Sequence, residues 1–157
     1  MPAIPLSLTV QYGTPAPDLP RWRLRRWVAA AARAAARAPV FPFRSLDLTL
    51  RLVDAEEGRQ LNREFRQRDY ATNVLTFEYG ADPDGTARGD IILCVPVLHK
   101  EAAEQHKPLL AHAAHLTVHG VLHALGHDHI DAGEARVMEG METAILAGMG
   151  IPDPYHA

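Results

Sequence analysis

The spacing of apolar residues along the chain switches between two periods, and the order of the switches limits the folds open to it. Residues 6–12 and 46–53 alternate apolar and polar side chains, a pattern typical of strands that bury one face. Residues 21–38 instead repeat apolar side chains at helical spacing, from Leu24 to Ala38. The first third of the chain therefore predicts a strand, a helix and a second strand.

A capping pattern marks the start of the next helix. Asp54, with Glu57 three residues later, forms the arrangement of a capping box. We expect the helix that it begins to end near Arg66 and to turn Leu61 and Phe65 towards the core.

The rest of the chain predicts two strands followed by three helices. These elements span 73–79, 89–95, 96–106, 108–126 and 132–147. The last helix should bury Val137 and Met138. The order βαβαββααα predicts one α+β domain over residues 1–157, in which a small mixed four-stranded sheet packs with about five helices.

The cysteine content indicates the cellular compartment in which the protein works. Its single cysteine, Cys94, excludes an intramolecular disulfide and lies in an apolar run typical of a core. This is the pattern of a protein in a reducing cytoplasm, which is the location that we expect. The first twelve residues lack the features of a signal peptide, and no apolar stretch suits a membrane span.

Charge is divided unevenly between the two halves of the chain. The net charge is −3, but residues 1–70 sum to +5 and residues 71–157 to −8. One helical face of the basic half carries a stripe of arginines opposite the apolar face, namely Arg23, Arg26, Arg33 and Arg37. Most such stripes are solvated surfaces; the alternative is that this one follows the phosphates of an RNA backbone.

Histidines are concentrated in one segment, where five of the nine lie between residues 115 and 129. His119 and His123 are four residues apart, so a helix places both imidazoles on one face. Gly126 can adopt the left-handed backbone that ends a helix, after which the chain can bring His129 beside the other two. We predict that these three histidines bind one divalent ion, most suitably zinc.

Three neutral imidazoles leave one coordination position open, as in catalytic zinc sites. The ion could then lower the pKa of a bound water to about 7 and generate a nucleophile. Zinc peptidases with this spacing carry a glutamate directly after the first histidine, and here that residue is Gly120. Asp128 is a candidate to orient a histidine or to accept a proton, and a cap of the next turn is an equal alternative.

The remaining histidines are expected to be ordinary polar residues. His127 should point away from the ion. His115 shares a helical face with His119 and could instead contact a metal ligand or the substrate. The other four are expected at the surface, namely His99, His106, His112 and His156.

The string from His119 to His129 closely resembles the signature of the YbeY endoribonuclease family, bacterial proteins of rRNA maturation. Other blocks resemble that family in the same order and spacing, and the resemblance covers roughly residues 45–155. These blocks are Leu-Asn-Arg-Glu-Phe-Arg at 61–66, Thr-Asn-Val-Leu-Thr-Phe at 72–77, Gly-Asp-Ile-Ile-Leu at 89–93, and Glu101-Ala102.

The resemblance implies a zinc-dependent endoribonuclease that is specific for single-stranded RNA. It implies a role in maturing the 3′ end of small-subunit rRNA and in ribosome quality control, with the small ribosomal subunit and its proteins as partners and no DNA substrate. The family's three metal ligands fall on His119, His123 and His129, for one Zn²⁺ per chain, and its required arginine falls on Arg66.

Arg66 also has a chemical rationale of its own. A guanidinium binds phosphate through two parallel hydrogen bonds and stays charged, so it could hold the scissile phosphate and offset charge in the transition state. A surface or ion-paired arginine is the simpler interpretation of the residue taken alone. We expect a cleft between the histidine helix and the sheet, with Arg66 on the wall opposite the metal ligands.

Two other functions compete with RNA cleavage. A metallopeptidase would need a general base, and Gly120 stands where these enzymes carry it. A non-catalytic, metal-containing assembly factor that binds ribosomal RNA or protein is compatible with every feature of the sequence.

Overall fold

A four-stranded mixed sheet forms the centre of the computed structural model, which describes residues 4–128 and 130–155. The strands lie in the order β1-β2-β4-β3, with β1, β2 and β4 parallel and β3 antiparallel to β4. Their bounds are β1 Leu6–Tyr12, β2 Ser45–Val53, β3 Val74–Ala81 and β4 Thr86–Cys94. Two strands, β1 and β3, are therefore edges of the sheet.

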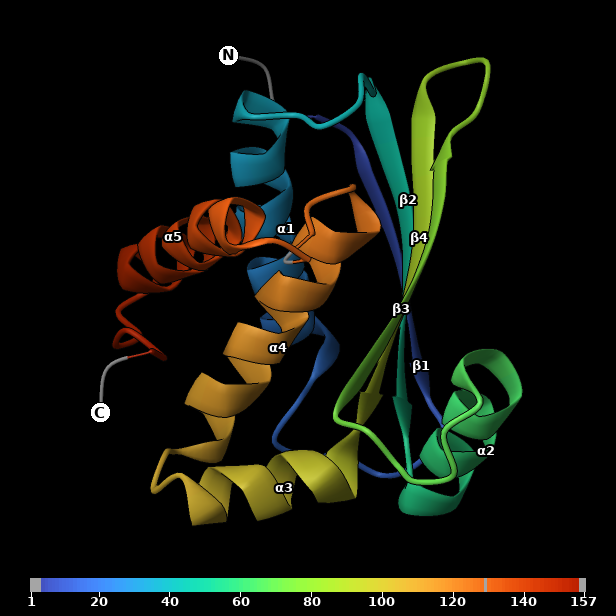
Figure 1. Ribbon diagram of the computed structural model, residues 1–157, viewed down its shortest axis with the longest axis vertical. Coiled ribbons are helices and arrows are strands. Elements are labelled where there is room, and N and C mark those ends of the chain that lie inside the picture. The colour runs from blue at the N-terminus through green and yellow to red at the C-terminus, as the bar shows by residue number, and fades with distance from the viewer. Residues whose placement is uncertain (1–3, 129, 156–157) are drawn as a thin grey trace.

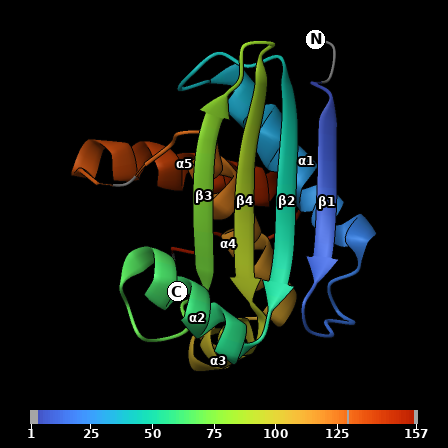
Figure 2. The same cartoon turned by 90° about the vertical axis from the view of Figure 1, so that its right-hand side faces the viewer.

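Helices cover mainly one face of this sheet. Figure 1 shows α1, α4 and α5 on that face and α2 on the other, while α3 lies below α4. The view along the sheet normal in Figure 2 agrees, with α2 in front of the sheet and α1, α4 and α5 behind it. The bounds are α1 Arg21–Arg37, α2 Ala55–Arg66, α3 Val95–Glu104, α4 Leu109–Ala124 and α5 Ala132–Gly148. The predicted order of elements is thus confirmed over the described part of the chain.

The alternation in β2 explains this division into a core face and an open face. Leu46, Leu48, Leu50 and Leu52 are buried, whereas the side chains between them are only half-buried. On the other side of the core, α4 buries ten of its sixteen residues, because it packs against both the sheet and its neighbouring helices. No helix among residues 4–128 and 130–155 is long and apolar enough to cross a membrane.

Two core predictions are wrong. Phe65 is 49% exposed, because α2 approaches the sheet through Gly58 and Asn62 and leaves the Phe65 ring edge-on to Phe77 at 5.3 Å. Val137 is 59% exposed, because α5 buries only a narrow stripe at Met138, Glu142 and Leu146. Apolar residues next to such a stripe face solvent even when they fit a helical pattern.

Glycines let α4 lie unusually close to the sheet. A Cβ on Gly120 would lie 2.7 Å from Cγ2 of Ile91, and one on Gly89 would lie 2.9 Å from the Cβ of Ala124. Both are closer than side-chain carbon atoms can approach without a shift of the structure. The helix backbone therefore rests directly on β4.

We predict that Gly120→Ala destabilises the fold by about 1–3 kcal/mol, because the added methyl group overlaps Ile91 in a packed core. Gly140→Ala is the matched control, since Gly140 is also helical and a Cβ there meets nothing within 4 Å. That control should be neutral or stabilising by about 0.5–1 kcal/mol, because alanine is the better helix former. Urea unfolding measures both, and equal effects of the two substitutions would refute the close contact.

Candidate metal centre and active site

Three histidines form a half-buried stripe along α4. His115, His119 and His123 are spaced by four residues, and consecutive ring centroids lie 6.5 and 6.2 Å apart. This helical face is turned about a quarter of a revolution from the one that carries Gly120, since adjacent helical residues differ by about 100°. The predicted placement of His119 and His123 on one face is confirmed.

The chain reverses directly after α4, as Gly126 predicted. Its φ of +99° is in the region that favours glycine. The amide of His127 donates to the carbonyl of Leu122 at 3.0 Å, and that of Gly126 to His123 at 3.0 Å. This pair of hydrogen bonds is the Schellman motif, which ends a helix and turns the chain back.

The segment beyond this turn leads into α5, whose first turn is capped by Asp131. The Asp131 carboxylate accepts a hydrogen bond from the amide of Glu134 at 2.7 Å. The third predicted ligand, His129, lies outside the described residues. Within the described ranges, no three His, Cys, Asp or Glu side chains are placed to hold one ion.

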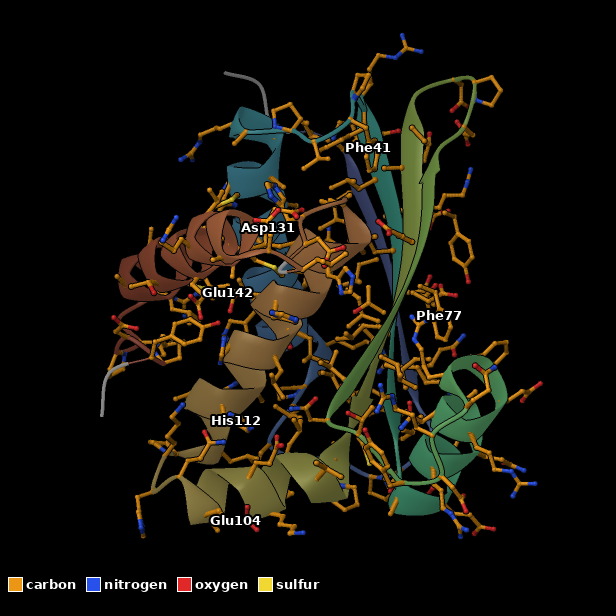
Figure 3. The ribbon with its side chains drawn as sticks, viewed as in Figure 1. Phe41, Phe77, Glu104, His112, Asp131 and Glu142 are labelled. Atoms are coloured by element: carbon orange, nitrogen blue, oxygen red, sulfur yellow. The ribbon has the colours of Figure 1, made fainter. Side chains whose placement is uncertain are left out.

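A buried carboxylate that sequence reasoning missed joins two of the histidines. Glu142 of α5 is 1% exposed, and its Oε2 accepts from Nδ1 of His119 at 3.2 Å. Its Oε1 accepts from Nε2 of His115 at 2.6 Å and from the hydroxyl of Tyr155 at 2.6 Å. In Figure 3, Glu142 lies between α5 and α4. The sequence signal was its position at helical spacing between Met138 and Leu146, where a carboxylate can be buried only with partners.

The surroundings of Glu142 keep it ionised. Burial alone would raise the pKa of its carboxyl, but hydrogen bonds from His115, His119 and Tyr155 outweigh burial and lower that pKa to about 2. Burial and the same hydrogen bond raise the pKa of the Tyr155 hydroxyl. A negative charge is thus fixed beside the histidine stripe.

These contacts fit a bound divalent cation. An imidazole has two nitrogens, and a carboxylate that accepts from Nδ1–H leaves Nε2 as the nitrogen that can coordinate a metal. His119 has that arrangement, and His123 lies one helical turn away. The donor chemistry of the described residues therefore suits zinc, whose protein ligands include neutral imidazoles.

Two other histidines are buried. His112 was expected at the surface, and this is wrong: it is 4% exposed and bonds through Nε2 to Glu101 at 2.9 Å. Glu101 also accepts from the Asn73 amide at 3.0 Å, so the network ties α3 and α4 to the start of β3. His127 is buried beside α1, where burial lowers the pKa of its imidazole and a hydrogen bond with the backbone of Ala38 opposes that shift.

Arg66 is the last residue of α2 and lies at the open edge of β3. Its Nη2 donates to the carbonyl of Thr76 at 2.8 Å, and its guanidinium lies 5.3 Å from the centroid of the Phe77 ring. Figure 3 shows Phe77 on the side of the sheet where α2 lies. Arg66 is exposed, as the surface interpretation expects, and no ion pair joins it to a carboxylate of the described residues.

The predicted cleft between the histidine helix and the sheet is not found in that place. The contacts of Gly120 with Ile91 and of Ala124 with Gly89 fill the space under α4 with core. Arg66 and the histidines are related instead through the sheet. Ile91 pairs with Thr76, whose carbonyl holds Arg66, and Ile91 touches the residue that follows His119.

The arginine stripe lies on α1, behind the sheet. Figure 2 shows α1 running diagonally behind the strands, from beside β1 to behind β4. Arg26 and Arg33 are exposed, whereas Arg23 is half-buried and its guanidinium stacks on Trp22 at 4.8 Å. Asp128, the other candidate, is half-buried just after the turn at Gly126.

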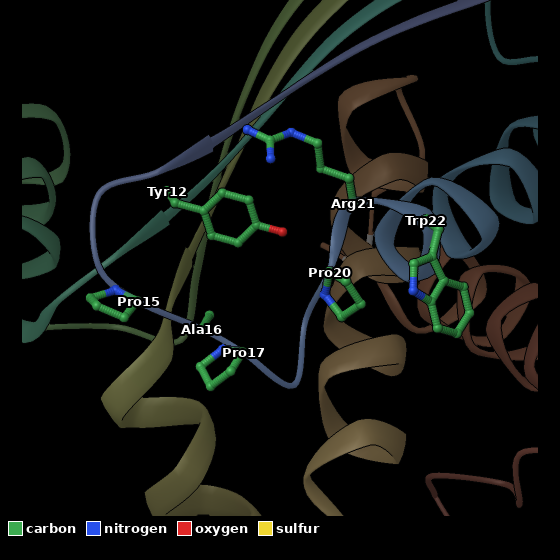
Figure 4. A pocket seen from close by; sticks show the side chains of 7 residues that line it. All are labelled: Tyr12, Pro15, Ala16, Pro17, Pro20, Arg21 and Trp22. Atoms are coloured by element: carbon green, nitrogen blue, oxygen red, sulfur yellow. The ribbon is translucent and has the colours of Figure 1, made fainter.

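A separate apolar hollow of about 530 Å³ lies where β1 leads into α1. Tyr12, Trp22 and three prolines surround it, as Figure 4 shows. None of the predicted site residues lines this hollow, so it is not the candidate active site.

Known proteins resemble this chain along its length. The sequence profile of the family described as Endoribonuclease YbeY matches residues 15–150. A protein of Bordetella pertussis named Endoribonuclease YbeY is 67% identical over 155 residues, covering 99% of each chain. One of Thiobacillus denitrificans with the same name is 50% identical over 153 residues, covering 97% of each chain.

A solved structure supports the fold independently. The solution structure of a Thermotoga maritima protein aligns with a TM-score of 0.59 over 96% of this chain and 99% of that one, at 19% identity. At that identity the likeness concerns the fold alone. The match of the family profile and the relatives at half to two-thirds identity show that this chain belongs to the Endoribonuclease YbeY family.

Proposed function

We propose that this protein is an endoribonuclease that cleaves single-stranded RNA during rRNA maturation, at a zinc centre formed by His119, His123 and His129. The family supports RNA cleavage. Within the chain, one observation carries the proposal: a buried carboxylate accepts from Nδ1 of His119 and so reserves Nε2 for a metal. The ribosomal small subunit and its proteins are the proposed partners, and the cytoplasm is the proposed location.

In this proposal the histidines hold the ion and the surrounding residues orient them. Zinc, when bound, would supply a Lewis acid that activates water at neutral pH and polarises a phosphoryl oxygen. In the proposal, His129 follows the turn at Gly126 by three residues and would complete the set with His119 and His123. Asp128, half-buried beside this turn, would orient a histidine or take up a proton.

Arg66 would bind the phosphodiester. One of its N–H groups is already used by the Thr76 carbonyl, which fixes the guanidinium, and the remaining donors can take two oxygens of a phosphate. The face of Phe77 adds a cation–π contact that further restricts the side chain. A cation held in place beforehand stabilises developing negative charge without reorganisation.

A peptidase mechanism is disfavoured by packing as well as by sequence. The position that holds the peptidase glutamate is Gly120, where even a Cβ would lie 2.7 Å from Ile91. A general base therefore cannot be placed there without displacing α4 from the sheet. A non-catalytic assembly factor remains the second candidate, and cleavage of single-stranded RNA by the wild type but not by His123→Ala would eliminate it.

We predict one tightly bound divalent ion per chain, and a large loss of metal in His119→Ala, because each ligand contributes a major share of the coordination energy. Elemental analysis of purified protein measures the occupancy. His99→Ala is the matched control, since His99 is exposed on α3 and should keep the full metal content. Full occupancy in His119→Ala would show that the ligand assignment is wrong.

We predict that Arg66→Ala keeps the fold and the metal but lowers the cleavage rate by about 100-fold or more, as expected for removal of a group that stabilises transition-state charge. Arg66→Lys should recover little, because an ammonium group cannot form the two parallel bonds. Arg63→Ala, exposed one turn earlier on the same helix, is the control and should cleave normally. Wild-type cleavage by the lysine variant would reduce the role of Arg66 to charge alone.

The arginine stripe on α1 gives a further prediction. If it guides RNA, replacing Arg23, Arg26 and Arg33 by glutamate should weaken binding to all sequences while the rate on bound RNA barely changes. Each lost phosphate contact should also reduce the salt dependence of log K by about 0.7 for a single strand. Titrations of labelled RNA at several salt concentrations measure both, and unchanged binding would leave the stripe as a solvated surface.

A further inference from the structure

We infer that Glu142 is a positioning residue of the metal centre, which fixes His119 with Nδ1 protonated and Nε2 directed to the ion. This inference rests on the proposed metal centre. It concerns a residue of α5, a helix that contributes none of the proposed ligands.

The two carboxylate oxygens of Glu142 have different hydrogen-bond partners. Oε2 accepts from Nδ1 of His119, while Oε1 accepts from His115 and from the Tyr155 hydroxyl. The two donors to Oε1 belong to segments on either side of Glu142 in the sequence, α4 before it and the C-terminal segment after it. Together they hold the carboxylate in one orientation. Because Glu142 is 1% exposed, no bulk solvent competes for these bonds.

The same carboxylate explains why His115 is not a metal ligand although it belongs to the stripe. His115 contacts Glu142 through Nε2, the nitrogen that points furthest from the helix, whereas His119 contacts it through Nδ1. The carboxylate thus engages the outer nitrogen of His115 but the inner nitrogen of His119, so Nε2 is the nitrogen of His119 without the proton that Glu142 binds. One buried charge therefore selects His119 and excludes His115 from an otherwise regular row of three imidazoles.

A negative charge at this position also raises the affinity of the site. An imidazole whose N–H donates to a carboxylate is a more basic ligand, and loss of such a partner typically weakens metal binding about 10- to 100-fold. Glu142→Gln preserves the shape and one acceptor oxygen but removes the charge. We expect this variant to bind zinc about 10- to 100-fold more weakly than the wild type.

Competition with a chromophoric zinc chelator, using the full chain, tests this. Tyr155→Phe is the matched control, because it removes a hydrogen bond from Oε1 and leaves the contact between Oε2 and His119 intact. Its zinc affinity should stay within about threefold of the wild type. Equal affinity in Glu142→Gln and wild type would overturn the inference, and so would equal losses in Glu142→Gln and Tyr155→Phe.

A second measurement separates positioning from stability. Cobalt(II) in place of zinc reports its ligand environment through visible absorption, so Glu142→Gln should shift those bands while Tyr155→Phe should not. A structural role alone would lower the unfolding temperature of the metal-free protein and leave the bands and the zinc affinity unchanged. If Glu142→Gln does not fold, Glu142→Asp replaces it, since the shorter carboxylate keeps the charge but withdraws from His119.

The wild-type titration distinguishes failure of this inference from failure of the proposed function. A wild-type chain that binds no zinc or cobalt would overturn both the metal centre and the role of Glu142. A wild type that binds metal tightly, alongside a Glu142→Gln variant that binds it equally well, would leave the metal centre standing and overturn the role of Glu142 alone.

Discussion

The direct contact of α4 with β4 is the constraint on which the candidate site depends. Gly120 and Gly89 remove the side chains that would otherwise keep the helix and the strand apart. With the helix backbone seated on Ile91, its rotation about its own axis is fixed. That rotation leaves His115, His119 and His123 half-buried, and Glu142 of α5 contacts the first two.

The histidines of α4 lie against a buried carboxylate, that of Glu142, and provide two of its hydrogen-bond donors. An ionised carboxylate in a core is costly unless several donors satisfy it. Glu142 receives three hydrogen bonds, from His115, His119 and Tyr155, which come from two segments well separated in the sequence. The packing of α5 on α4 is therefore coupled to the orientation of the histidines, and the C-terminal segment closes the network through Tyr155.

Local signals in the sequence were sufficient where the structure is local. The cap at Asp54, the reversal at Gly126 and the bounds of β1 and α2 follow from residues within a few positions of one another. Predictions were wrong where the outcome depends on distant partners. His112 is buried because the Glu101 carboxylate, which also accepts from Asn73, bonds to it, and Phe65 is exposed because α2 meets the sheet through Gly58. Glu142 could not be singled out from the sequence, because its role depends on contacts with side chains of α4 that are distant in the chain.

The relation of Arg66 to the histidines shows how such distant coupling can serve chemistry. His119 precedes Gly120, which touches Ile91; Ile91 pairs with Thr76, and the Thr76 carbonyl holds Arg66. The steps from Gly120 to Thr76 are core and backbone contacts, and only the last step is a side chain, the exposed Arg66, which the Thr76 carbonyl and the Phe77 ring hold. A phosphate-binding group and a metal-binding group that must act on one phosphodiester need a constant separation. Strand β3 pairs with β4 on one side only and is packed on by α4, so Arg66 donates to a carbonyl of a supported edge strand, as the proposed role in phosphate binding requires.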